Sequence, residues 1–229
     1  MRKRLPFLIL LLSGVVWALI APTTSAQSPS PLEDELLRNA TLVFERATQV
    51  PYAAIPAAVM LRARGVVVIP AAHTAGTLYY GIGAFSARQG PFDEWTPPAI
   101  LAFQGALPVA LESQDVDFVL LPMTSLGMNA LVEDRYTGGS LGPIVAGGIG
   151  SPMQGAPSAD ILGYVRFGKY FAGMTIEDWQ VSEMRVSNKQ LYGRAYSTDE
   201  IVRGSGFFHL PKSARQFRET LSAYFRDMS

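Results

Sequence analysis

The sequence contains no cysteine and only two histidines, and each scarcity removes a class of chemistry. Without cysteine the chain can form neither a disulfide framework nor a thiolate metal site, so a hydrophobic core must stabilise the fold alone. The histidines, His73 and His209, are far apart in the sequence and form no pair at helical spacing. We therefore predict neither a metal site nor a cofactor.

Basic residues are in excess at the N-terminus. Arg2, Lys3 and Arg4 precede an apolar stretch over residues 5–20, and Thr24-Ser25-Ala26 follows. This pattern is typical of a secretory signal peptide, although an uncleaved anchor is an alternative. We predict a signal peptide over 1–26, a linker over 27–31, a single domain over 32–229, and export to the periplasm or cell envelope. Because no cysteine follows the apolar stretch, a lipid anchor on cysteine is excluded.

The remaining chain is mildly acidic. Residues 1–26 hold three of the 19 basic residues and none of the 19 acidic ones, so residues 27–229 carry a net charge of −3. A nucleic-acid-binding protein would need a clear basic excess, so we predict no nucleic-acid partner. A domain of this length can bury one substantial hydrophobic core.

Two strands are predicted between Gly65 and Arg88. Val66–Ile69 is a continuous apolar run that we expect to be buried on both faces and to end at Pro70. From Thr77 to Phe85 the residues alternate, and Gly81 and Gly83 share one face with Tyr79 and Phe85. Glycine weakens a strand, so these two positions indicate close approach by another backbone, a helix or a ligand.

Further short strands are predicted over residues 99–103, 107–111 and 116–121, with Pro108 placing the second at a sheet edge. Glu177, Asp178 and Glu183 lie along a polar strand, where we expect solvated carboxylates.

Amphipathic helices are predicted at both ends of the domain. The first begins at Leu32 and has an acidic polar face; we expect it to dock on the body, with an interfacial membrane helix as the alternative. The last is opened by Pro211 and carries four basic residues outside its apolar face. Shorter helices are expected over 55–64, 124–132 and, capped by Thr198, 199–203. The predicted fold class is α+β: an antiparallel sheet or barrel-like meander of short strands, packed with the N-terminal and C-terminal helices.

Two motifs resemble catalytic loops without meeting their requirements. Gly138-Gly-Ser140-Leu-Gly142 has the spacing of a nucleophile elbow, but a polar segment precedes it and Pro143 follows, where a strand and a helix are needed. Gly147-Gly-Ile-Gly150 lacks the Gly-Lys-Ser/Thr of a phosphate loop, and Ser151-Pro152 follows instead of a helix start. We therefore predict that the protein is not an enzyme.

Several motifs resemble the SYLF family, whose members occur alone in bacteria and beside SH3 or FYVE domains in eukaryotes, with relatives in yeast actin patches. The first part of the pattern is, in chain order, a glycine, a strand ending in Ile-Pro, a turn glycine, a Gly-x-Gly pair and Trp-Thr-Pro-Pro. The second part is a glycine-rich segment, then Phe-Ala-Gly, then Asn-x-x-x-Tyr-Gly. The residues that carry the resemblance are Gly65, Gly76, Gly81, Gly83, Trp95, Pro98, Gly147, Gly150, Gly173, Asn188, Tyr192 and Gly193. Gly148 stands where the family usually has proline.

The resemblance implies a non-catalytic module that binds phospholipids, with phosphoinositide-type or other anionic headgroups. In such a module basic residues near helix ends would contact the membrane surface. The residues that fit are Arg62, Arg64, Lys212, Arg215 and Arg218. The alternative is a structural or protein-interaction domain of the envelope that has the same fold without lipid binding.

Overall fold

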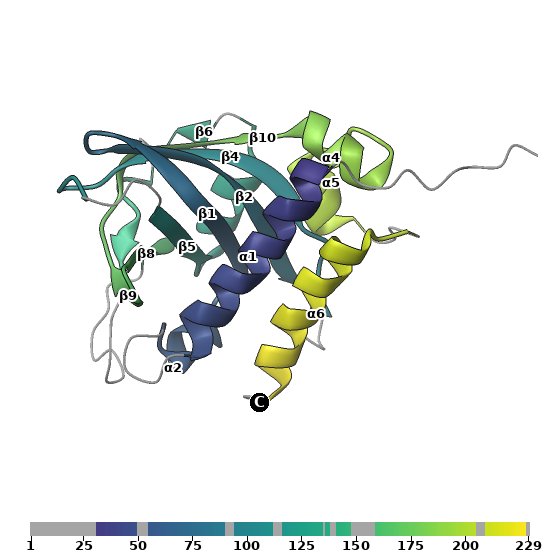
Figure 1. Ribbon diagram of the computed structural model, residues 1–229, viewed down its shortest axis with the longest axis horizontal. Helices are drawn as coiled ribbons and strands as arrows, with labels where there is room; N and C mark the ends of the chain where they lie inside the picture. Colours follow the sequence, from purple (N-terminus) through teal and green to yellow (C-terminus); the bar gives the residue numbers. More distant parts are fainter. Residues whose placement is uncertain are drawn as a thin grey trace, which may run out of the picture.

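The computed structural model describes residues 31–49, 55–89, 94–111, 116–134, 136–137, 141–147, 159–204 and 209–227. A curled sheet runs through this part of the chain, and helices cover both of its sides (Figure 1). Its strand order is β6-β10-β4-β2-β1-β5-β8-β7, with β3 paired to β2 and β9 paired to β8. The named strand pairs are antiparallel except β7 with β8, which confirms the predicted α+β class with a mainly antiparallel sheet.

The helices are α1 (Pro31–Gln49), α2 (Ala57–Met60), α3 (Ser125–Val132), α4 (Arg185–Tyr192), α5 (Thr198–Arg203) and α6 (Lys212–Asp227). The strands are β1 (Gly65–Ala75), β2 (Leu78–Gln89), β3 (Glu94–Trp95), β4 (Ala99–Ala106), β5 (Val116–Pro122), β6 (Tyr136–Thr137), β7 (Val145–Ala146), β8 (Ile161–Phe167), β9 (Tyr170–Gly173) and β10 (Glu177–Glu183).

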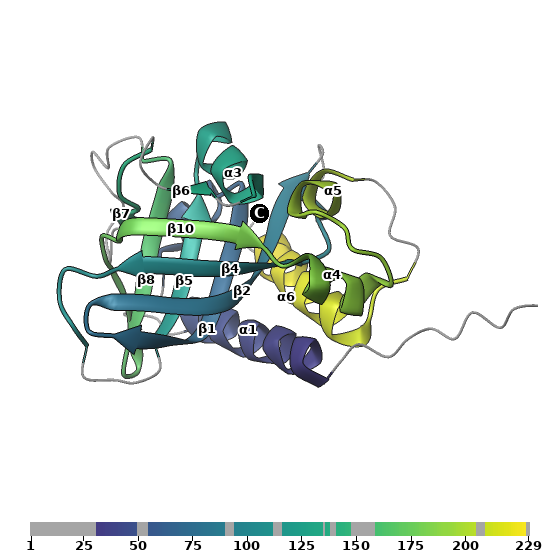
Figure 2. The same cartoon turned by 90° about the horizontal axis from the view of Figure 1, so that it is seen from above.

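Helices α1 and α6 lie side by side on one side of the sheet (Figures 1 and 2). The Phe44 ring of α1 meets the Tyr224 ring of α6 edge-on, with centroids 5.6 Å apart. Leu37 and Phe217 are also fully buried in this layer, and burying each large apolar side chain contributes roughly 1.5–3 kcal/mol. The first helix is therefore docked on the body, and the alternative of an interfacial membrane helix is wrong.

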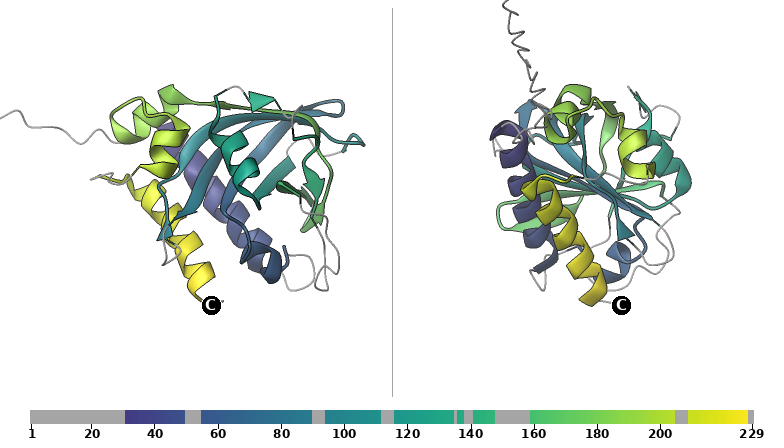
Figure 3. Two further views of the ribbon diagram at one scale, coloured as in Figure 1. Left: turned by 180° about the vertical axis from the view of Figure 1, so that it is seen from behind. Right: turned by 90° about the vertical axis from the view of Figure 1, so that its right-hand side faces the viewer.

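The opposite side of the sheet is covered by α3 and α5 (Figure 3). The predicted two-sided burial of the first strand is confirmed, since Val66, Val67, Val68 and Ile69 have no exposed surface. Val66 and Val68 belong to the core layer under α1 and α6, whereas Val67 and Ile69 belong to the layer under α3 and α5. β1 thus supplies the centre of both cores.

The first strand does not end at Pro70, as the sequence suggested. β1 continues to Ala75, but its pairing with β2 shifts between Val68 and His73, and Pro70 falls inside this β-bulge. A bulge leaves residues unpaired, so the missing N–H of proline removes no ladder hydrogen bond there.

Residues 107–111 are not a strand, which corrects another prediction. The Leu107 N–H donates to Thr77 O at 2.9 Å, and Val109 is 53% exposed. The strands predicted over residues 99–103 and 116–121 are confirmed, since they correspond to β4 and β5. Pro108 therefore lies in a surface connection and not at a sheet edge.

The helix boundaries also differ in places. α2 ends at Met60 and Gly65 already belongs to β1, so the second helix is shorter than predicted. α5 is capped by Ser197, one residue before the predicted cap, and Glu200 completes a capping box. α4 was not predicted at all. Within the described part of the chain, no helix combines the length and apolar character that a membrane crossing needs.

Candidate functional site

Four arginines line one hollow of about 630 Å³ on the surface. Arg62 and Arg64 come from the connection between α2 and β1, Arg88 from β2, and Arg203 from the end of α5. The structure thus joins the two predicted lipid-binding residues Arg62 and Arg64 to two arginines that are distant in the sequence. None of the residues that line this arginine hollow is Asp or Glu.

The β1–β2 ladder brings Arg64 and Arg88 together. The Arg88 N–H donates to Arg64 O at 2.8 Å, directly beside the Gly65–Ala87 pair. The register of the hairpin therefore places the backbones of Arg64 and Arg88 side by side at the hollow. Like charges directly opposite each other in an antiparallel pair destabilise a sheet.

The Arg88 guanidinium is held in place. Its Nη1 donates to Leu61 O at 2.7 Å and Ala63 O at 3.2 Å, and its charge lies 5.1 Å from the ring centre of Phe225 in α6. These contacts hold the Arg88 side chain in one orientation, so less side-chain entropy is lost when a ligand binds.

The other arginines differ in their partners. Arg203 donates to Asn129 Oδ1 at 2.7 Å and pairs with Asp199 one turn earlier, also at 2.7 Å. Arg62 and Arg64 are exposed, and neither forms an ion pair within the described residues. These two side chains are therefore available to an external anion.

The remaining predicted lipid-binding residues lie elsewhere. Lys212 and Arg215 are exposed in the first turn of α6, and Arg218 follows one turn later. Arg218 precedes Phe225 by two helical turns, which is about 10 Å along the axis. The structure therefore separates the five predicted residues into two groups, the arginine hollow and the start of α6.

Gly147 and Gly173 are in direct backbone contact. A side chain at Gly173 would overlap Gly147 O, and one at Gly147 would overlap the buried Tyr164 ring. Burial also raises the pKa of the Tyr164 hydroxyl above its usual range. These two family-motif glycines therefore allow β7, β8 and β9 to approach closely.

The Asn-x-x-x-Tyr-Gly motif fastens α4 to β4. Asn188 Oδ1 accepts from Ile100 N at 2.9 Å, and its Nδ2 donates to Tyr196 O at 3.1 Å. The Tyr192 hydroxyl donates to Pro98 O at 2.6 Å, and Gly193 ends the helix at φ 76°, a left-handed conformation that suits glycine. In the structure the motif makes contacts that stabilise the fold.

The earlier motif residues also make structural contacts. Trp95 is 4% exposed and packs against Phe225, with ring centres 4.8 Å apart. A side chain at Gly65 would come within 2.9 Å of the Phe85 ring, whereas Gly76 has φ 71° in the turn between β1 and β2. These positions therefore shape the β1–β2 hairpin and its contact with α6.

Some predictions remain open. Gly150, Gly148 and Ser140 lie outside the described residues, so the structure tests neither the nucleophile-elbow motif nor that part of the glycine-rich motif. Among the described residues, no three His, Asp or Glu side chains gather closely enough to hold a metal ion. The prediction of a solvated Glu183 is wrong: its carboxylate accepts from Thr198 N at 3.1 Å and pairs with Arg185.

Comparison with known proteins places the chain in a family. The model of the Ysc84 family, described as "Las17-binding protein actin regulator", matches residues 109–224. This is half of the chain, and it contains the glycine-rich, Phe-Ala-Gly and Asn-x-x-x-Tyr-Gly motifs. The protein therefore belongs to the Ysc84 family, which is the SYLF family indicated by its motifs. Neither a curated protein nor a solved structure matches the chain.

Proposed function

We propose that this protein is a non-catalytic module that binds anionic phospholipids at a membrane surface of the cell envelope. The observation that carries the proposal is the arginine hollow, whose lining contains Arg62, Arg64, Arg88 and Arg203 and no acidic residue. Guanidinium groups bind phosphate through paired, charge-assisted hydrogen bonds. A phosphate headgroup is therefore the ligand that this hollow suits best.

Local charge must provide the attraction, because residues 27–229 carry a net charge of −3. A basic residue near an anionic membrane contributes about 1 kcal/mol, so about three or four together support reversible binding. The arginine hollow contains four arginines, of which Arg203 already pairs with Asp199. Lys212, Arg215 and Arg218 provide a second basic group for lipids bound elsewhere on the membrane surface.

The proposed location follows from the N-terminal sequence. Arg2, Lys3 and Arg4 before an apolar stretch support export, and exported bacterial-type proteins encounter phosphatidylglycerol or cardiolipin more often than phosphoinositides. We propose these lipids as the ligands in the cell. Removal of residues 1–26 retains every helix and strand of the described fold, since the first of them begins at Pro31.

Sedimentation with liposomes tests this function. Residues 27–229 should sediment with vesicles that contain phosphatidylglycerol and stay in solution with phosphatidylcholine vesicles. Binding should weaken as salt concentration rises, because salt screens exposed charges over a Debye length of about 8 Å at physiological ionic strength. Equal binding to both vesicles, or binding to neither, would contradict the proposal.

A second candidate function is a protein-interaction domain of the envelope without lipid binding. The family description, which names a protein-binding regulator, supports it. Val186 of α4 adds an apolar contact point, because 72% of this residue is exposed. A partner captured from envelope extracts, equally well before and after lipid extraction, would favour this function over the first.

A further inference from the structure

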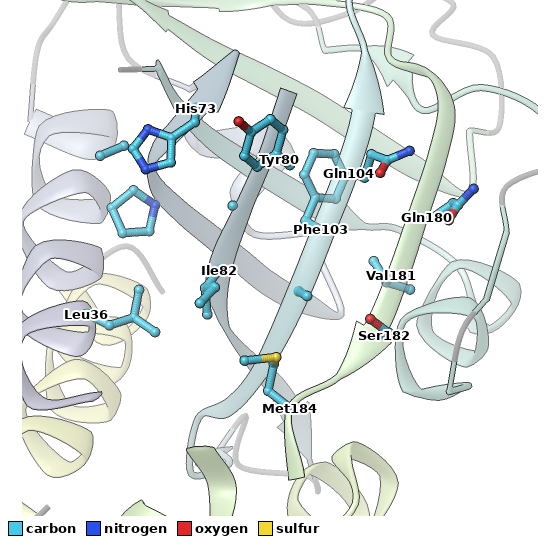
Figure 4. Close-up of a pocket in the computed structure, with 14 residues that line it drawn as sticks. Leu36, His73, Tyr80, Ile82, Phe103, Gln104, Gln180, Val181, Ser182 and Met184 are labelled. Atoms are coloured by element: carbon cyan, nitrogen blue, oxygen red, sulfur yellow. The ribbon is translucent and has the colours of Figure 1, made fainter. Parts of the chain in front are cut away.

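A second concavity, separate from the arginine hollow, lies on the side of the sheet that carries α1. This groove of about 880 Å³ crosses β1, β2, β4 and β10, and Leu36 of α1 forms one wall (Figure 4). Its size lies within the range of about 300–1,000 Å³ that is usual for small-molecule sites. No Lys, Arg, Asp or Glu lines it.

A bulge in β1 turns His73 into the groove. Val68 pairs with Ala84, but His73 pairs with Tyr80, so one extra residue has entered β1 between these pairs. A one-residue shift exchanges the faces of a strand. Without it Ala72 would lie opposite Tyr80; with it Ala72 is buried in the core and His73 lines the groove.

The bulge is a strained feature that a buried charge maintains. Ala71 has φ 49°, a left-handed conformation that is unfavourable for alanine. Its N–H donates to Asp117 Oδ1 at 2.9 Å, and the other oxygen of Asp117, which is 3% exposed, pairs with Arg166. Strain of this kind persists where the surrounding structure enforces it, often beside a functional site.

A second bulge lies at the opposite wall, in β10. Glu177 pairs with Ala106, but Gln180 pairs with Gln104, which again indicates one extra residue. Asp178 in this bulge has φ 46°; it and Ala71 are the two residues other than glycine with positive φ in the described chain. The shift buries Trp179 and turns Gln180 into the groove.

The two bulges complete a row of polar side chains across four strands. The register pairs His73 with Tyr80, Tyr80 with Gln104, and Gln104 with Gln180. Figure 4 shows these four side chains along one end of the groove. An imidazole, a phenol and two carboxamides can together both donate and accept hydrogen bonds, and none of them is a strong cation.

The other end of the groove is mainly apolar, with Ser182 of β10 as its one polar lining residue. Two residues further along the strands, Ile82 pairs with Ala102, and beyond them Met184 and Leu36 close the groove (Figure 4). Burial of a hydrocarbon chain here is favourable in proportion to the apolar area removed from water. The groove therefore has one hydrogen-bonding end and one hydrophobic end.

We propose that this groove binds a single-chain acyl amphiphile with an uncharged, hydroxyl-bearing head, such as a monoacylglycerol. The head lies against the row His73–Tyr80–Gln104–Gln180, and the acyl chain extends past Ile82 towards Leu36 and Met184. A carboxylate or phosphate head would find no lysine or arginine in this lining to pair with its charge. The site is independent of the arginine hollow and of the proposed function.

Calorimetric titration of residues 27–229 with monodecanoylglycerol, below its micelle concentration, tests the inference. We expect saturable binding of one molecule, and binding of decanoate or decyl phosphate that is weaker by about tenfold, because the lining offers no cationic side chain to pair with their charge. Equal affinity for decanoate and monodecanoylglycerol, or no saturable binding, would overturn the inference.

Variants locate the ligand. Ala102→Phe should fill the groove and abolish binding, whereas Gln180→Leu, at an exposed position that cannot disturb the core, should weaken it by about tenfold. Gln190→Leu, on the exposed surface of α4, is the matched control and should bind normally. The Arg62→Glu/Arg64→Glu protein should also bind normally. Normal binding by both Ala102→Phe and Gln180→Leu, or loss of binding by the arginine variant, would contradict the assignment.

Discussion

Ile69 of β1 fills the space beside Gly83 of β2. A Cβ atom at Gly83 would come within 2.7 Å of Ile69 Cγ1 and within 2.9 Å of Val68 O. Ile69 also occupies the space beside Gly81, where a Cβ would lie 2.8 Å from its Cγ2. The glycine face of β2 is therefore occupied by the neighbouring strand, which is the close approach that the Gly-x-Gly pair indicated.

Gly83→Val should destabilise the protein by roughly 1–3 kcal/mol, although valine favours strands, because the core must accept an overpacked side chain. Thermal unfolding measures the effect, and Ala75→Val, at an exposed position of β1, serves as the control without a clash. An unchanged melting temperature together with lost lipid binding would instead mean that the glycines line a lipid groove. If neither property changed, our account of β2 would be wrong.

Asp117→Ala should lower the free energy of unfolding by about 1–3 kcal/mol, because it leaves Ala71 N–H without its acceptor and Arg166 without its ion pair. Urea unfolding would measure this loss. Asp117→Asn keeps an acceptor oxygen, so its free energy of unfolding should fall by less than that of Asp117→Ala. If Asp117→Ala were as stable as the native protein, the carboxylate would not maintain the β1 bulge.

The stability of the protein should fall in strong alkali. Burial raises the pKa of the Tyr192 hydroxyl, so the folded state keeps its proton at a pH where the unfolded chain, with a tyrosine pKa of about 10, loses it. The stabilisation from the protonated Tyr192 hydroxyl is fully present below the unfolded pKa of about 10, and it is lost as the pH rises from there towards the folded pKa. Unfolding at a series of pH values should show this decline.

Tyr192→Phe should make the alkaline decline shallower. The substitution should also lower the free energy of unfolding by about 0.5–1.5 kcal/mol at neutral pH, because Pro98 O loses the hydrogen bond from the tyrosine hydroxyl. Tyr170→Phe is the control, since that tyrosine is 59% exposed. An equally steep decline in Tyr192→Phe would contradict a role for this buried hydroxyl.

The spacing of apolar residues was sufficient to predict the long helices and several of the main strands. The apolar stripes of α1 and α6 and the runs that form β4 and β5 bury enough surface to decide their own structure. α4 could not be recognised in this way, because Val186 is exposed and Leu191 is the only large apolar residue buried in the helix. Asn188 and Tyr192, which form side-chain hydrogen bonds to distant backbone, hold this helix in place.

The arginine hollow could be predicted only in part. Arg62 and Arg64 stood out because they flank a predicted helix end, whereas Arg88 joins them through strand register. Ala75 of β1 pairs with Leu78 of β2 beside the turn. If the pairing continued from there without a bulge, Arg64 would lie opposite Gln89. The extra residue in β1 changes this register, and the sequence contains no local signal for it beyond Pro70. Arg203 arrives through the packing of α5, which no spacing predicts.

The most direct test of the proposed function is liposome sedimentation of Arg62→Glu/Arg64→Glu beside Lys169→Glu/Lys189→Glu. Both variants change the net charge equally, and Lys169 and Lys189 are exposed far from the arginine hollow in the sequence. Our account predicts that the arginine variant loses binding to phosphatidylglycerol vesicles by about tenfold or more, since about 1 kcal/mol per basic residue is removed and repulsion is added. The lysine variant should bind nearly as well as the native protein. Equal losses in the two variants would show that overall charge, and not the arginine hollow, governs the interaction.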